Sequence, residues 1–333
     1  MAGRVCPLAY RYSASAVRAA ANHVTDSALI VGGLYGNSAA LAAVLELADA
    51  EELATGSRPL LVFNGDFNWF NAAPPDLLGV NATIRNECGD GRAVATAGNV
   101  EVEMARAVPV PGSNRMDAVG CGCAYPAYID DDVVRRSNAL MERLRRSLRI
   151  AQPEELALEV TDWLRELPLY TRLSVGGLRV AVLHGDTNSL AGWSLAAEAV
   201  SPPDTALLAS MGLHPPSHSS PEGHHQLTTE ADVEAALESV GADVIACTHT
   251  CLPFAQAFHN GHSLVINNGS AGMPNFPLIE AAGNRGGGGM ITRISTTPFE
   301  AASSNSGSNG DGRVVAAQRL YLNHPCPCLY PAR

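Results

Sequence analysis

The chain has 333 residues, of which 46% are hydrophobic and 17% charged, and its formal net charge is −11. This composition excludes a disordered or fibrous protein, and the length allows one large domain or two smaller ones. The negative charge argues against general nucleic-acid binding and against binding to anionic membranes, because both need a basic surface.

The N-terminal residues 1–20 lack the apolar core of a secretory signal. No run of about eighteen apolar residues occurs, so we expect no membrane span. The eight cysteines, in a chain of this size, predict reduced thiols or metal ligands rather than a disulfide framework. We therefore expect a cytoplasmic protein, and association into a homo-oligomer is compatible with the sequence.

Short apolar runs that end in polar turns recur along the first hundred residues. Residues 28–33, 59–63 and 93–97 are typical of buried strands, and the last two run into Asn64-Gly65-Asp66 and Gly98-Asn99. Asn37 is placed to cap a helix after the first strand. The pattern predicts a layered α/β fold with a site at the strand ends.

The middle of the chain predicts two helices and a hairpin. Residues 130–132 precede the first helix and Pro153 opens the second. The hairpin pairs residues 169–175 with 178–183 and ends at His184, and further strands are expected near 243–246, 254–258 and 263–267. We expect a single domain over 1–333, with its core at 27–321 and a His/Pro/Ser-rich loop insertion at 200–229.

Four polar side chains with metal-ligand chemistry follow predicted strands: Asp66, Asn99, His184 and His249. The carboxyl ends of strands in an open α/β sheet converge on one crevice, so residues from four strands can meet there. Two imidazoles, one carboxylate and one amide oxygen suit Mn, Fe or Zn. Each residue alone is more typical of a turn or cap, and the prediction depends on all four together.

The order of these turns resembles the calcineurin-like metallophosphoesterases, and in particular their small bacterial phosphodiesterase branch. The segments that match the motifs of this family are, in order, Gly33-Leu34-Tyr35-Gly36-Asn37, Gly65-Asp66, Gly98-Asn99-Val100, His184-Gly185, residues 248–254 and Gly269-Ser270-Ala271-Gly272-Met273-Pro274. The resemblance implies a four-layer sandwich of two mixed β-sheets flanked by helices. It also implies that the four residues named above form one complete metal half-site.

The chain departs from the family at the other half-site. Gly33, Tyr35 and Cys251 stand where the family has metal ligands beside the bridging Asp66, and Val100 replaces the general-acid histidine. The loss is one-sided, which favours a single-metal or rearranged centre. Cys251 is a tentative thiolate ligand or a small buried thiol, and Tyr35 is a weak ligand, a hydrogen-bond donor to phosphate or a ring that fills the vacated space.

The resemblance implies hydrolysis of a phosphomonoester or phosphodiester. The metal would polarise a phosphoryl oxygen and lower the pKa of a bound water, with Asp66, Asn99 and His249 as catalytic residues. We expect Tyr35, Asn37 and Asn68 to contact a small phosphorylated substrate. Without the acid histidine, substrates with good leaving groups are favoured, and turnover should be slow.

The alternative is a catalytically weak or inactive protein that uses the same fold as a binding scaffold, as a retromer subunit of this fold does. A third hypothesis is that the altered half-site hosts different metal chemistry, with Cys251 selecting iron or zinc.

Other features carry weaker hypotheses. Four histidines of the 200–229 loop could reach over the site, although a solvated loop is the simpler interpretation: His214, His218, His224 and His225. Trp69 and Phe70 line a substrate pocket or serve only for packing. Two close cysteine pairs, at 121/123 and 326/328, fit no standard zinc motif and are predicted to be structural. Glu101 and Glu103 are expected at solvated positions, with one of them able to face the cleft.

Overall fold

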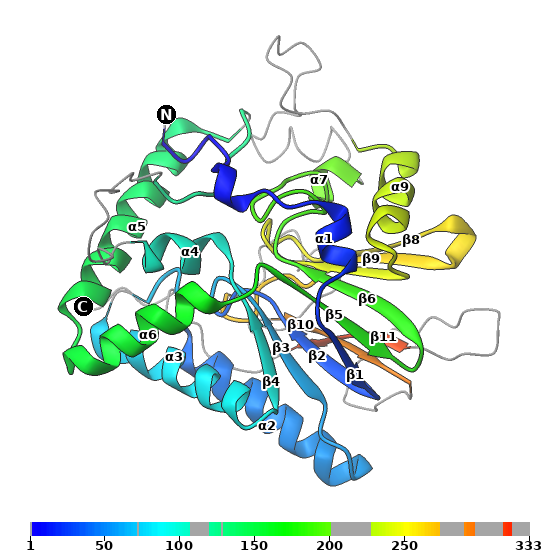
Figure 1. Cartoon of the computed structure of the whole chain (residues 1–333), viewed down its shortest axis with the longest axis horizontal. Coiled ribbons are helices and arrows are strands. Elements are labelled where there is room, and N and C mark those ends of the chain that lie inside the picture. The colour runs from blue at the N-terminus through cyan, green and yellow to red at the C-terminus, as the bar shows by residue number, and fades with distance from the viewer. Residues whose placement is uncertain are drawn as a thin grey trace.

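Two β-sheets lie face to face, and helices cover their outer sides (Figure 1). The computed structural model describes residues 2–71, 73–106, 120–127, 129–200, 228–273, 290–296 and 316–321. The first sheet has six strands, in the spatial order β1 (Asn22–Thr25), β5 (Tyr170–Val175), β6 (Leu178–Leu183), β7 (Val244–Cys247), β9 (Ser263–Asn267) and β8 (Phe254–Phe258). The second has five, in the order β11 (Ala316–Tyr321), β10 (Met290–Ser295), β2 (Ser27–Val31), β3 (Leu60–Asn64) and β4 (Ala93–Thr96).

Both sheets are mixed, and their central strands run parallel in pairs. β2, β3 and β4 pair in parallel, whereas β10 is antiparallel to β2. β6, β7 and β9 are likewise parallel, whereas β5 and β8 pair antiparallel at either side. The carboxyl ends of β3 and β4, and those of β6 and β7, therefore lie at one edge of each sheet, which is where polar turns can form a site.

Alternating side chains of each strand serve two different layers. Ala28 and Ile30 of β2 are buried between the sheets with Val180 and Val182 of β6. Leu29 and Val31 belong instead to the core beneath the helices. This period of two is the signature of a strand buried on both faces, and it explains why the strand segments are almost continuously apolar.

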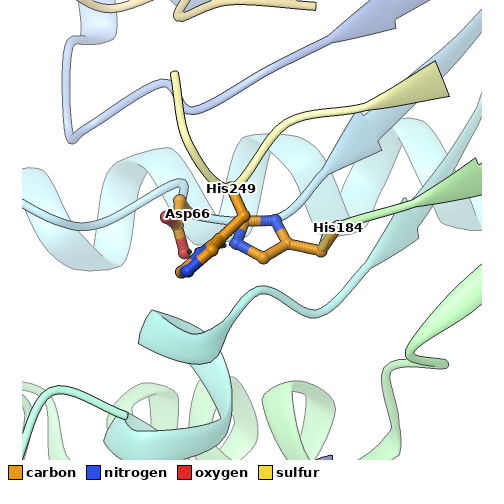
Figure 2. A group of neighbouring side chains, drawn as sticks. All are labelled: Asp66, His184 and His249. Carbon is orange, nitrogen blue, oxygen red and sulfur yellow. Dashed lines mark ion pairs between the residues drawn. The ribbon is translucent and has the colours of Figure 1, made fainter. Parts of the chain in front are cut away.

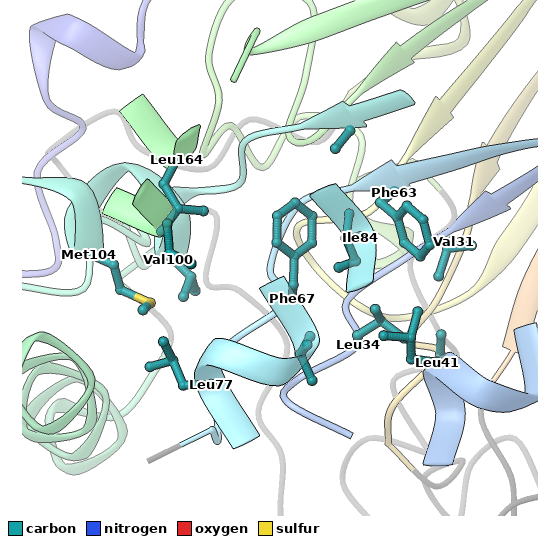
Figure 3. Packing of buried hydrophobic residues seen from close by; sticks show 14 of the residues in the cluster. Val31, Leu34, Leu41, Phe63, Phe67, Leu77, Ile84, Val100, Met104 and Leu164 are labelled. Atoms are coloured by element: carbon teal, nitrogen blue, oxygen red, sulfur yellow. The ribbon is translucent and has the colours of Figure 1, made fainter. Parts of the chain in front are cut away.

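Helices complete the outer layers. Those packed on the five-stranded sheet are α2 (Ser38–Thr55), α3 (Pro74–Gly89), α4 (Asn99–Ala105), α5 (Asp131–Ile150) and α6 (Glu154–Glu166). Figure 3 shows Leu41 of α2, Phe63 of β3 and Leu164 of α6 within this core. The six-stranded sheet is covered by α1 (Ala14–Arg18) and α9 (Glu230–Val240), with the short α7 (Ala197–Val200) beside them. Two 3-10 turns complete the described elements, η1 (Leu8–Tyr10), whose Tyr10 hydroxyl bonds to Glu103 of α4, and η2 (His259–Gly261), which follows β8. The predicted four-layer α/β architecture is confirmed.

Several local predictions are also confirmed. Asn37 caps α2, because its side-chain oxygen accepts a hydrogen bond from the Ala40 N–H at 3.0 Å. The predicted hairpin is the antiparallel pair β5–β6, with Gly176 and Gly177 at its turn. Pro153 precedes α6 as its N-cap rather than forming its first residue. None of the helices that the structure describes is both long and apolar enough to cross a lipid bilayer.

Candidate metal centre

Three side chains with metal-ligand atoms meet where strands of the two sheets end. Asp66 follows β3, His184 follows β6 and His249 follows β7. Their ligand atoms all lie within 4.8 Å of one another, and all three residues are buried (Figure 2). The structure therefore brings together three of the four residues at which the sequence analysis expected a metal, and the hydrogen bonds described below place Asn99 beside them.

A strained turn holds Asp66. Its backbone φ is +56°, a conformation that residues with a side chain seldom adopt. The preceding Gly65 also has a positive φ, and a Cβ there would lie 2.4 Å from the Gly98 nitrogen. The turn thus lets the loops after β3 and β4 approach closely, and such strain persists only where the surroundings hold it.

Glu101 provides that restraint. Its carboxylate accepts hydrogen bonds from the backbone N–H groups of Asp66 at 2.6 Å, Phe67 at 2.9 Å and Gly98 at 3.0 Å. Burial raises the pKa of Glu101 to about 7, and the neighbouring charge of Asp66 adds to the effect. The expected solvated position was wrong for both glutamates, because Glu101 and Glu103 are completely buried.

His184 has one ring nitrogen fixed and the other directed into the site. Nδ1 contacts the Asn64 carbonyl oxygen at 2.9 Å, and a carbonyl can only accept, so Nδ1 carries the proton. Nε2 then faces Asp66 Oδ1 at 3.4 Å and Asn99 Oδ1 at 3.2 Å. Burial lowers the pKa of His184, but the charge and hydrogen bond of Asp66 outweigh this and leave the pKa raised.

Asn99, the first residue of α4, presents its oxygen to the site. Its Nδ2 donates a hydrogen bond to the Cys121 carbonyl at 3.0 Å, which turns Oδ1 toward His184. Asp66 Oδ1 is also near this helix start, where it accepts a hydrogen bond from the Val100 N–H at 3.3 Å. The side chain of Val100 is buried in the helix-side core (Figure 3). The position that carries the general acid in the family thus serves packing here.

His249 presents a nitrogen without a partner. Its Nε2 donates to the Cys123 carbonyl at 3.1 Å, and the same carbonyl accepts the Trp193 indole N–H at 2.9 Å. Its Nδ1 is buried and has no hydrogen-bond partner among the described residues. Burial, followed by the charge of His184, lowers the pKa of His249 to about 4. A neutral imidazole with a free, buried lone pair costs free energy unless something binds it.

The donor set fits a divalent transition metal ion. The Asn64 carbonyl assigns the proton of His184 to Nδ1, and the Cys123 carbonyl assigns that of His249 to Nε2. The Nε2 lone pair of His184, the Nδ1 lone pair of His249 and the oxygens of Asp66 and Asn99 are then all acceptors. Acceptors that face one another across 3.2–3.4 Å repel unless a proton or a cation lies between them. Nitrogen and oxygen donors of this kind suit Mn, Fe or Zn, and the metal's identity stays a prediction.

The second half-site is filled by an aromatic ring. A Cβ on Gly33 would lie 2.7 Å from Cζ of Tyr35, so the ring occupies the space into which a side chain at position 33 would project. The Tyr35 hydroxyl contacts the Cys251 thiol, and its ring packs against Phe70 with 5.8 Å between centroids. Of the three hypotheses for Tyr35, the structure supports the space-filling ring. Cys251 lies outside the three-residue ligand group, and its ligand role stays a prediction.

The two asparagines expected at the substrate are used within the fold. Asn37 caps α2 and donates to the Gly272 carbonyl at 3.0 Å. Asn68 is completely buried and exchanges hydrogen bonds with Asn81 at 2.8 and 3.2 Å. Both residues therefore have structural partners, and their contact with substrate stays a prediction.

The Cys121-Gly122-Cys123 turn orients two of the four candidate ligands, a role that the sequence analysis missed. Its carbonyl groups fix the amide of Asn99 and the ring of His249, and both thiols are free and buried. Gly122 has φ +66°, and a Cβ there would lie 2.1 Å from the Tyr10 hydroxyl. No side-chain pattern could reveal these contacts, because backbone carbonyl groups make them. The prediction of a structural role for this pair is consistent with them.

Some predictions fall on residues 201–227, 274–289 and 322–333, which lie outside the described residues. They concern His214, His218, His224 and His225, Pro274 of the last motif, and the cysteine pair at 326 and 328.

Comparison with known proteins gives a likeness of fold. No family model matches the chain, and no curated protein matches it. The hypothetical protein PH1004 from Pyrococcus horikoshii OT3 superposes with a TM-score of 0.51 at 14% identity, over 91% of this chain and 89% of that one. A metallophosphoesterase from Sphaerobacter thermophilus superposes with a TM-score of 0.42 at 14% identity, over 89% and 88%.

At such low identity the likeness concerns the fold alone. Together with the strand order, it shows that this chain shares the fold of PH1004, two mixed β-sheets flanked by helices, with a buried Asp/His/His group where strand ends meet.

Proposed function

We propose that this protein binds one divalent transition metal ion through Asp66, Asn99, His184 and His249 and hydrolyses a phosphomonoester or phosphodiester. The observation that supports it most directly is the unpartnered Nδ1 of His249 beside two other ligand groups. When bound, the metal would act as a Lewis acid and make a water molecule a better nucleophile at neutral pH.

The protein's own residues would hold and orient these ligands. Asn64 and Cys123 keep the two imidazoles in the tautomers that leave one lone pair each for the metal. Glu101 holds the Asp66 turn in its strained conformation. Such outer partners set the geometry of a metal site and are nearly as important for affinity as the ligands themselves.

The substrate would be a small phosphorylated molecule with a good leaving group. Val100 stands at the family's proton-donor position, and its buried aliphatic side chain cannot donate a proton. Protonation of a poor leaving group would therefore be slow. Aryl phosphates and phosphodiesters with acidic leaving groups are the first substrates to test.

The experiment combines metal analysis with turnover. Wild-type protein, His249→Ala and the control His262→Ala, which alters an exposed histidine outside the site, are loaded with Mn, Fe or Zn and assayed on aryl phosphates. We expect one metal per chain and turnover in the wild type and control, and loss of both in His249→Ala. Turnover that survives in His249→Ala would refute the assignment.

A binding scaffold is the second candidate, and one observation favours it: the Tyr35 ring occupies the other half-site. The same experiment distinguishes it. A scaffold predicts that wild type and control hold metal but release no product from any of the esters.

A further inference from the structure

A second polar site lies at the opposite ends of strands β6 and β7. A pocket of about 550 Å³ is bounded there by Arg18 of α1, Arg172 of β5, Arg179 of β6, Asp243 before β7 and His259 of η2. We call it the arginine pocket. Arg179 and His184 are five positions apart along β6 and the residue that follows it, so at about 3.3 Å per residue the pocket lies roughly 16 Å from the candidate metal centre.

Only one of the three arginines has a carboxylate partner. Arg179 forms a two-pronged ion pair with Asp243, with N–O distances of 2.6 and 3.1 Å. Arg18 and Arg172 form no ion pair with any carboxylate that the structure describes. The other acid at the rim, Glu238, has a side chain that is 76% exposed and approaches His259 at 3.5 Å. The three arginines therefore outnumber Asp243, which is ion-paired with Arg179 and also acts on the charge of Arg172, in a protein whose formal net charge is −11.

Helix capping explains part of this arrangement. Arg172 donates to the carbonyl groups of Val240 and Gly241 at 2.6 and 2.8 Å, and Arg18 donates to the Glu238 carbonyl, so both contact the C-terminal end of α9. One cation is enough to complement a helix C-terminus. A second arginine there, beside a third, adds like-charge repulsion that the capping does not require.

The cost of gathering these charges is visible at Arg172. It is only 8% exposed, and burial lowers the pKa of its guanidinium; the charges of Arg179 and Arg18 lower it further, and the charge of Asp243 only partly opposes them. An anion that binds beside these arginines would offset both the repulsion between them and the desolvation of Arg172, and would therefore stabilise the folded protein.

We propose that the arginine pocket binds the phosphate group of a small molecule. A phosphate dianion matches the two guanidinium groups that lack a carboxylate, and guanidinium presents forked donors suited to its oxygens. The pocket volume is within the usual range for small-ligand sites, and Leu237 and Ala242 supply apolar wall for an organic part. The inference does not depend on the proposed hydrolysis, because the two sites lie at opposite strand ends.

The test measures phosphate binding in the absence of metal. The full chain is treated with chelator, so that phosphate cannot bind at the metal centre, and is titrated with inorganic phosphate, AMP and acetate by calorimetry. We expect phosphate and AMP to bind and acetate to bind at least tenfold more weakly, since a monoanion compensates only one arginine. Tighter binding of AMP than of phosphate identifies an organic ligand, and equal binding identifies the free oxyanion.

Arg18→Gln is the informative variant, because Arg18 is exposed and its loss leaves Arg172 and the Arg179–Asp243 pair in place. We expect about tenfold weaker phosphate binding, the effect of one charge-assisted hydrogen bond. Arg11→Gln, which removes an exposed arginine outside the pocket, should bind as the wild type does. The proposal is overturned if the wild type binds neither phosphate nor AMP, or if Arg18→Gln binds them unchanged while its melting curve shows a folded protein.

Discussion

Replacement of Glu101 by glutamine should weaken metal binding far more than it weakens the fold. One carboxylate oxygen of Glu101 accepts the N–H groups of Asp66 and Gly98, and the other accepts that of Phe67. Glutamine keeps one acceptor oxygen, so its NH₂ group would face the N–H of Phe67 or, with the amide turned over, those of Asp66 and Gly98. The turn that carries Asp66 would then lose the contacts that hold its positive φ.

The magnitudes follow from two opposing effects. One or two buried N–H groups without an acceptor cost about 1–3 kcal/mol each, or about 1–6 kcal/mol in all, depending on the orientation of the amide. Against this, burial and then the charge of Asp66 raise the pKa of Glu101 from 4.5 to about 7. At a pH above both values, this shift corresponds to about 3 kcal/mol, which a neutral amide avoids. The net effect on the free energy of unfolding should therefore lie between a rise of about 2 kcal/mol and a fall of about 3 kcal/mol.

Metal affinity has no such compensation. Loss of a group that orients a metal ligand typically weakens binding about 10–100-fold, and we expect this for Glu101→Gln. Calorimetric titration with Zn or Mn measures the metal Kd, and urea unfolding of the metal-free protein measures stability.

Glu103→Gln is the matched control. Glu103 is equally buried, but its carboxylate binds Tyr10, Arg106 and Arg145 rather than the Asp66 turn. It should lose stability and keep its metal Kd. The reasoning is refuted if folded Glu101→Gln binds metal as tightly as the wild type, or if Glu103→Gln weakens binding to the same extent.

Two further predictions concern proton competition and the carbonyl turn. Metal affinity should rise with pH between about 6 and 8. Asp66 outweighs the effect of burial and holds the pKa of His184 above 6.5, so at lower pH the metal must displace a proton from this imidazole. His249, with its pKa lowered to about 4, adds no dependence in this range. Identical Kd values across the range would contradict this. Gly122→Ala should lower the melting temperature and weaken metal binding, because the φ of Gly122 is +66° and the new Cβ would lie 2.1 Å from the Tyr10 hydroxyl oxygen. Gly56→Ala is the control, because Gly56 also has a positive φ, +77°, but has open space around it. Equal effects in the two variants would argue against a special role for the carbonyl turn.

The fold and the ligand group could be predicted because both depend on local sequence patterns. The apolar runs at residues 28–33, 59–63 and 93–97 are β2, β3 and β4, although β2 already ends at Val31. A polar residue directly after such a run sits at a strand end, and parallel strands bring those ends together. This placed Asp66, His184 and His249 correctly before any distance was known.

The supporting contacts could not be predicted, because they arise only from tertiary packing. Glutamate is usually exposed, and nothing local in the sequence predicts that Glu101 and Glu103 are buried by contacts with the Asp66 turn and with Arg145. The roles of Cys121 and Cys123 lie in their carbonyl groups, which every residue possesses. The space-filling role of Tyr35 was one of three hypotheses from the sequence, and only the position of Gly33 next to the ring supports it over the other two.

The contact between Gly33 and Tyr35 also constrains how this protein can evolve. Aspartate at position 33 alone would collide with the ring, whose Cζ lies 2.7 Å from the Cβ position, and overpacking of this kind is destabilising. Removal of the ring alone would leave a cavity with no ligand to occupy it. Each of these two single substitutions is therefore disfavoured, and positions 33 and 35 are expected to change only together.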